Sequence, residues 1–132
     1  MNHSDTFAIG GDLEVHRLGF GAMRLTGEDV LGPPDDEAAA RDVLRRAVDL
    51  GVDLIDTADA YGPGVSERLI GETLDADRED LVVATKGGLL RHPEGAWPAH
   101  GDPAYLRNAV LASLDRLRTD EIDLYQLHRP DP

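Results

Sequence analysis

Four residues of the sequence have side chains that could carry out acid–base chemistry together. They are Asp56, Tyr61, Lys86 and His128. A phenol is a poor acid at neutral pH, because its unperturbed pKa is about 10. A nearby ammonium group stabilises the phenolate and makes the tyrosine a better proton donor, and a carboxylate can hold that ammonium charged and oriented. A histidine can donate a hydrogen bond to a carbonyl oxygen, so the set suits protonation of an oxygen on which negative charge develops, as when hydride reaches a carbonyl.

Apolar runs of strand length lead up to three of these residues. We expect strands over residues 52–56, 81–86 and 122–127. Residues two apart share one face of a strand, which groups Asp56 with Leu54, Lys86 with Ala84 and Val82, and His128 with Gln126, Leu124 and Ile122. The carboxyl ends of parallel strands are where α/β folds place their active sites. The sequence therefore predicts that three strand ends and the loop carrying Tyr61 meet at one edge of a sheet.

The remaining elements follow from periodicity, caps and turns. A hairpin is expected over residues 6–15, around Gly10-Gly11-Asp12, and another strand over residues 18–23. Apolar residues at helical spacing predict three helices, with loops at residues 26–34 and 87–101. These helices are expected from Asp35 or Asp36 to Leu50, from near Ser66 to Leu74, and from Asp102-Pro103 to Arg118. The pattern predicts one α/β domain over residues 1–132, with an N-terminal hairpin and then four parallel strands alternating with three helices.

Each of the four residues also has a structural interpretation. Asp56 could satisfy turn amides, and Tyr61 could be a loop aromatic packed at the rim of the fold. His128 stands two residues before a proline and is a weak signal alone. Lys86 is the one lysine among 13 basic residues, and chance or codon bias could produce this. However, a lysine offers a compact ammonium of adjustable pKa, which arginine does not. The four residues at matched strand ends favour the functional interpretation.

Composition excludes several other classes of protein. A net charge of -13, from 26 acidic and 13 basic residues, argues against binding to a nucleic-acid backbone. No apolar run reaches the roughly 18 residues of a membrane span, and residues 1–5 lack the layout of a signal peptide. Without cysteine there is no disulfide or thiolate metal site, so we expect a cytoplasmic protein. The five histidines show no paired metal-ligand spacing, so no metal site is predicted and a metal-dependent hydrolase is a distant alternative.

Several segments resemble the aldo-keto reductases. Three segments are similar, in order, to those that carry the catalytic tetrad of that family. They are residues 56–62 (Asp-Thr-Ala-Asp-Ala-Tyr-Gly), Thr85-Lys86 and Leu127-His128. Residues 18–24 look like its first barrel strand, residues 6–15 like the hairpin that closes its barrel, and Ser66-Glu67 like the start of its second helix. The resemblance implies a (β/α)8 TIM barrel and NADPH-dependent reduction of an aldehyde or ketone.

The resemblance also implies roles for individual residues. Tyr61 is expected to be the general acid, tuned by Lys86 and Asp56, with His128 positioning a small-molecule carbonyl substrate. The cofactor is expected near Asp56 and the end of the first barrel strand. The residues concerned there are Gly21, Ala22 and Met23, with Arg24 a weaker candidate. Tyr61, His128 and Trp97 are expected to bind substrate, although Trp97 could equally be a partly exposed loop aromatic.

The chain is short for such a barrel, which takes about 250 residues. It stops after its fourth strand, and in the family the other half binds most of the cofactor. We therefore expect the first half of a barrel, with the inward side chains of Leu54, Val82, Ala84 and Leu124 facing water and two open sheet edges that promote association. Alone, the chain is expected to be inactive and to aggregate, dimerise, stay partly molten or pair with a C-terminal half-barrel. The alternative is a non-catalytic half-barrel fragment or partner-binding module, and the carbonyl substrate stays open.

Overall fold

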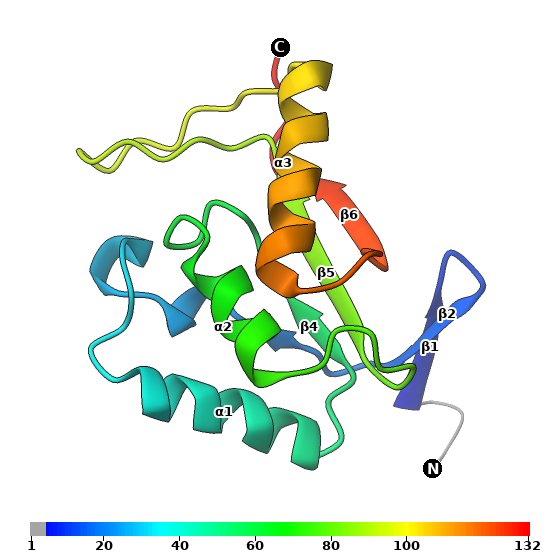
Figure 1. The fold of residues 1–132 in the computed structure, drawn as a ribbon. Helices are drawn as coiled ribbons and strands as arrows, with labels where there is room; N and C mark the ends of the chain where they lie inside the picture. Colours follow the sequence, from blue (N-terminus) through cyan, green and yellow to red (C-terminus); the bar gives the residue numbers. More distant parts are fainter. Residues whose placement is uncertain (1–4) are drawn as a thin grey trace.

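The structure, a computed structural model, describes residues 5–132 and is organised around one parallel sheet (Figure 1). The helices are α1 (Glu37–Asp49), α2 (Val65–Thr73) and α3 (Pro103–Leu117), and two 3-10 turns cover Met23–Leu25 and Glu28–Val30. The strands are β1 (Thr6–Ile9), β2 (Leu13–His16), β3 (Phe20–Gly21), β4 (Leu54–Asp56), β5 (Val82–Gly87) and β6 (Leu124–Leu127).

The sheet has the strand order that the sequence predicts. Strands β3, β4, β5 and β6 are neighbours in that order and all pair in parallel, while β1 and β2 form a separate antiparallel hairpin. In Figure 1 the three helices lie over one face of the sheet and the hairpin lies beside its lower end. The predicted α/β architecture, a hairpin followed by four parallel strands with three helices, is confirmed.

The helices begin where the predicted caps stand. The Asp36 carboxylate accepts a hydrogen bond from the Ala39 amide at 3.0 Å, which satisfies one of the free donors at the start of α1. Asp102 accepts from the amides of Ala104 and Tyr105, at 2.9 and 3.1 Å, and proline follows as the first residue of α3. These local contacts set the phase of each helix, and with it the face that packs on the sheet.

The core lies between the helices and the sheet. Its fully buried members include Leu44 of α1, Ile55 of β4, Leu69 and Ile70 of α2, and Leu117 of α3. Ile55 is the immediate neighbour of Asp56, and successive strand residues point to opposite faces. The helix-facing side of β4 therefore packs in the core, and Asp56 lies on the opposite face of the sheet.

Three predicted segments differ in the structure. The strand expected over residues 18–23 pairs only at Phe20 and Gly21, because Ala22 already has φ -94° and ψ 6° and leads into a 3-10 turn. The loop at residues 26–34 contains a second 3-10 turn over Glu28–Val30. The loop at residues 87–101 folds back on itself, with a β-bridge between Leu89 and Ala99.

The expectation that four inward apolar side chains face water is wrong for two of them. Val82 and Ala84 are buried, and Leu54 and Leu124 are partly buried. Ala84 is small and lies in register between Asp56 and Leu124 on the neighbouring strands. The hairpin is also tied to the start of the sheet, since the His16 ring and amide both contact the Asp53 carboxylate at 2.9 Å. The chain therefore covers part of this face by itself.

Candidate active site

A lysine–aspartate pair lies at the carboxyl ends of β4 and β5. Lys86 Nζ donates to Asp56 Oδ2 at 2.9 Å and to the Thr57 carbonyl at 2.7 Å, and the lysine side chain is largely buried. Gln126 of β6 donates to the other oxygen, Asp56 Oδ1, at 3.2 Å. Three adjacent strands therefore fix this carboxylate, and the ammonium has two acceptors that keep it charged and oriented.

Tyr61 packs beside this pair, on a loop that turns through two glycines. Its ring is buried, and the ring centroid lies 5.3 Å from Lys86 Nζ and 5.8 Å from the His128 ring centroid at an interplanar angle of 86°. Gly62 and Gly64 have φ values of +118° and +75°, which only glycine adopts without strain. The loop conformation thus turns the chain back into α2 directly after the phenol.

His128 completes the group from the end of β6. Its amide donates to the Gly87 carbonyl at 2.8 Å, which holds it beside the end of β5. Burial is the main cause that lowers its pKa below the ordinary value, and the charges of Lys86 and Arg129 lower it further, against an opposing effect of Asp56. The ring is therefore neutral at pH 7. Its Nδ1 atom is buried and has no hydrogen-bond partner within residues 5–132.

The residues expected near a cofactor divide into two groups. Gly21 is in register with Asp56, and the Ala22 amide donates to the Asp56 carbonyl at 2.8 Å, so this strand end lies against the tetrad. A Cβ added at Gly21 would meet no atom within 4 Å, so the position borders open space. Met23 and Arg24 instead line a hollow of about 460 Å³ together with Glu28 and Asp29, to which no tetrad residue contributes.

Trp97 lies on the returning arm of the segment after β5, and its ring faces an arginine. The Arg91 guanidinium is 3.6 Å from the Trp97 ring centroid, and the Trp97 carbonyl accepts from Arg129 Nη1 at 2.9 Å. The structure thus connects Trp97 to the residue next to His128, but its ring packs on Arg91 and has no ring contact with Tyr61 or His128 among the described residues.

Arg91 is a residue that sequence reasoning did not single out. Its Nη1 donates to the carbonyls of Val30 and Ala60 at 2.7 and 3.0 Å, and its Nη2 donates to the Asp29 carbonyl at 2.7 Å. One guanidinium therefore joins the loop before Tyr61 to the 3-10 turn at Glu28–Val30. These acceptors lie 31 to 62 positions away in the chain, so no local sequence signal marks them.

Comparison with known proteins shows the family of the chain. A sequence model described as the aldo/keto reductase family matches residues 17–132, which include all four tetrad residues. The chain belongs to the aldo/keto reductase family. An uncharacterized oxidoreductase of Schizosaccharomyces pombe is 48% identical over 122 residues, covering 92% of this chain and 40% of that protein. The pyridoxine 4-dehydrogenase of Escherichia coli is 44% identical over 124 residues, covering 94% of this chain and 43% of the enzyme.

Solved structures of the family share the fold. A glycerol dehydrogenase from Gluconobacter oxydans superposes with a TM-score of 0.81 at 38% identity, over 98% of this chain and 41% of that one. An aldo-keto reductase from Klebsiella pneumoniae in complex with NADPH gives a TM-score of 0.72 at 28% identity, over 97% of this chain and 40% of that one. The chain spans about two fifths of the length of these relatives. Its fold is thus the first part of the family's (β/α)8 barrel.

Residues 5–132 contain neither a metal-binding cluster nor a membrane-spanning helix. No three His, Cys, Asp or Glu side chains gather closely enough there to hold a metal ion. None of the helices in this part of the chain combines the length and the apolar character that crossing a membrane requires.

Proposed function

We propose that Asp56, Tyr61, Lys86 and His128 form the proton-transfer site of an NADPH-dependent reductase of aldehydes or ketones. The observation that carries this proposal is the Lys86 ammonium, which is held by Asp56 and Thr57 at 2.9 and 2.7 Å and lies 5.3 Å from the Tyr61 ring. A positive charge fixed in this place favours the phenolate that remains after Tyr61 gives up its proton.

The proposed reaction assigns one task to each side chain. Tyr61 donates its proton to the carbonyl oxygen as negative charge develops there, and Lys86 stabilises the resulting phenolate. Asp56 and Gln126 keep Lys86 oriented through the bonds described above. His128, neutral because burial lowers its pKa, donates a hydrogen bond to the same oxygen and orients the substrate. Solvent later returns a proton to Tyr61.

The residues present fit a nicotinamide cofactor beside the tetrad. The open space at Gly21 borders the region where the nicotinamide ring would lie, beside Asp56 in register on the next strand. Gly21 and Asp56 would hold the nicotinamide end, with Met23 and Arg24 further along the same segment. Ala22 was also expected there, but it is fully buried, and its amide and carbonyl are bonded to Asp56 and Leu25, so it would only hold Gly21 in place. When bound, the reduced cofactor supplies the hydride that reaches the carbonyl carbon. NADPH is proposed because the Klebsiella pneumoniae neighbour binds it.

The substrate class is proposed only as far as the relatives suggest it. The two relatives with named activities are a pyridoxine 4-dehydrogenase and a glycerol dehydrogenase, and both names describe oxidation of an alcohol. A small aldehyde or ketone, or the corresponding alcohol in the reverse direction, is therefore the proposed substrate. Because the chain matches only two fifths of these enzymes, we propose that residues 1–132 alone are inactive and that a C-terminal half-barrel must pair with them.

A chimera tests this proposal. Residues 1–132 are fused to the matching C-terminal part of the E. coli pyridoxine 4-dehydrogenase, to which this chain is 44% identical, and NADPH oxidation by pyridoxal is followed at 340 nm. The chimera should turn over, and Tyr61→Phe should lower kcat by about 10²–10⁴-fold while NADPH binding is kept. Equal rates for the chimera and its Tyr61→Phe variant would overturn the assignment of the general acid.

The chain alone provides the second arm of the test. Titrated with NADPH, residues 1–132 should show no change in cofactor fluorescence, because most of the cofactor contacts are supplied by the other half. Tight binding of NADPH by the isolated chain would contradict the proposed inactivity. A chimera that folds and binds NADPH but never turns over would favour the non-catalytic alternative.

A further inference from the structure

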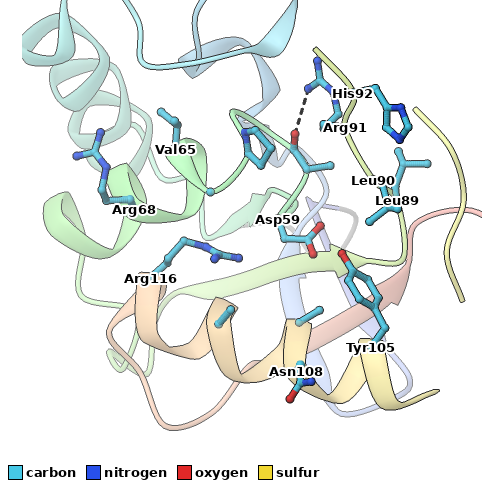
Figure 2. A pocket seen from close by; sticks show the side chains of 15 residues that line it. Asp59, Val65, Arg68, Leu89, Leu90, Arg91, His92, Tyr105, Asn108 and Arg116 are labelled. Atoms are coloured by element: carbon cyan, nitrogen blue, oxygen red, sulfur yellow. Dashed lines mark hydrogen bonds between the residues drawn. The ribbon is translucent and has the colours of Figure 1, made fainter. Parts of the chain in front are cut away.

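A second cavity lies on the helix-covered side of the sheet, behind the loop that carries Tyr61. It has a volume of about 740 Å³ and is enclosed by the start of α2, by α3 and by the segment after β5 (Figure 2). Much of its wall is apolar, and none of the four tetrad residues lines it. The apolar residues of the wall include Pro63, Val65, Leu89, Leu90, Ala109 and Ala112.

One carboxylate in this cavity has an unused oxygen. Asp59 is only 9% exposed, and its Oδ1 atom is buried without a hydrogen-bond partner within the part of the chain that the structure describes. Figure 2 shows its carboxylate between Arg116 and Tyr105. The backbone of Asp59 fixes this direction, because its amide donates to the Lys86 carbonyl at 3.2 Å and its carbonyl accepts from the Gly64 amide at 2.8 Å. A buried carboxylate oxygen without a donor is costly and rare, so this position calls for a donor.

The arginines that line the cavity are engaged elsewhere. Arg116 donates hydrogen bonds from Nε and Nη2 to Glu67 Oε1, at 2.9 and 2.7 Å. Arg68 donates to Glu37 and Glu72, at 2.6 and 3.1 Å, and Arg91 donates to the three backbone carbonyls described above. Around Asp59, the positive charge of Arg116 is thus matched by Glu67, and the Asp59 carboxylate is left without a cation of its own.

The protonation state of Asp59 fits a cation as the missing donor. The pKa of Asp59 is raised from 3.8 to about 6. Burial is the main cause and the negative charge of Glu67 adds to it, while Arg116 and the Ala60 amide oppose the rise. At pH 7.5 most molecules therefore carry an ionised carboxylate in a poorly hydrated place. A positively charged donor is favoured there over a neutral one, because the charge–charge attraction is strong where water is excluded.

We propose that this cavity binds a small organic monocation, a primary ammonium group on an apolar body, with the ammonium donating to the Asp59 carboxylate. The apolar body would lie against Leu89 and Leu90 on one side and against Ala109 and Ala112 of α3 on the other. The site is independent of the proposed reductase chemistry, because its lining residues lie outside the tetrad.

Binding can be measured on the 132-residue chain itself by ¹H–¹⁵N NMR titration at pH 7.5. The probe is benzylamine, and its neutral isostere benzyl alcohol is the control ligand. Benzylamine is expected to shift the amides around Asp59, Leu89–Leu90 and residues 105–112 and to saturate at millimolar concentration, with benzyl alcohol at least tenfold weaker. No shift at 20 mM benzylamine would mean that the position holds water alone, and equal affinity for the two ligands would remove the role of the charge. Either result overturns the proposal.

Three variants localise the site. Asp59→Asn keeps the shape and removes the charge, and benzylamine affinity should fall at least tenfold. Asp115→Asn removes an exposed carboxylate from α3 outside the cavity and should leave the affinity unchanged. Ala112→Leu narrows the cavity beside α3 and leaves Asp59 in place, so it should also weaken binding, and it decides the question if Asp59→Asn does not fold. Unchanged affinity in folded Asp59→Asn or in Ala112→Leu contradicts the proposal.

Discussion

Glu67→Gln should destabilise the chain strongly, although Glu67 is not one of the four tetrad residues. Glu67 is fully buried and accepts three hydrogen bonds from two other elements. Thr85 Oγ1 of β5 donates to one carboxylate oxygen at 2.9 Å, and Arg116 of α3 donates twice to the other, at 2.9 and 2.7 Å. Glutamine keeps the shape but removes the charge and offers an amide NH₂ group where a donor already points.

The size of the stability loss depends on the charge of Arg116, which Glu67→Gln leaves without a partner. Removing one partner of a buried ion pair costs about 3–5 kcal/mol, because the other charge is left uncompensated. The Arg116 side chain is 29% exposed, so water can solvate part of its charge, and we expect the lower end of the range, about 3 kcal/mol. With a urea m-value of about 2 kcal/mol/M, the unfolding midpoint would fall by about 1.5 M.

Urea unfolding, followed by circular dichroism and by the fluorescence of the single tryptophan, measures this loss. Asp80→Asn is the matched control, because Asp80 is 69% exposed and, within residues 5–132, its ion pair is with Arg78 two positions away, so it should leave the unfolding midpoint nearly unchanged. Combining Glu67→Gln with Arg116→Met should cost less than the sum of the two single changes. A loss in Glu67→Gln no larger than in the control would refute the structural role of this ion pair.

Three further predictions use other buried groups. The pKa of Asp59 is raised to about 6, so the folded chain binds the Asp59 proton more tightly than the unfolded chain does. The stability that results is fully present below pH 4 and is lost as the pH rises through 6. It amounts to at most about 3 kcal/mol. Urea midpoints between pH 4 and 7 should show this slope, and Asp59→Asn should flatten it. Lys86→Met should raise the pKa of His128 in an NMR titration, because the ammonium lowers it, though burial should still hold it below the ordinary value. Gly87→Ala should destabilise the chain by about 1–3 kcal/mol, since the added Cβ would lie 2.0 Å from the Tyr125 hydroxyl, and adding Tyr125→Phe should recover part of the loss.

The parts of the fold that local sequence determines were predictable. Asp36 and Asp102 cap the helices where the sequence indicates, because a cap needs only an acceptor within three residues of free amides. Strand parity places Asp56 and Lys86 on one face, and the two strands are adjacent and parallel, so the ion pair follows from alternation and order.

Contacts between distant segments were not predictable in this way. Val82 and Ala84 are buried, although the alternation pattern alone placed them on an open face, because burial depends on segments that are distant in the sequence. Arg91 bridges loops up to 62 positions away, and Glu67 is an ion-pair anchor that sequence reasoning used only as a helix-start residue. Trp97 was expected either to line a substrate pocket or to be a partly exposed loop aromatic, and its contact with the Arg91 guanidinium is one that no local pattern predicts.

The two faces of β5 explain why the tetrad can form within this chain. Thr85 faces the helices and donates to Glu67, and Lys86, the next residue, faces the other side and donates to Asp56. The buried ion pair that ties β5 to α2 and α3 thus holds the strand whose end carries the ammonium. All of these contacts lie between residues 56 and 128, so the other half of a barrel is not needed to make them. Glu67→Gln should therefore displace Lys86 and lower the rate of NADPH oxidation by the chimera, while Asp80→Asn should leave that rate unchanged.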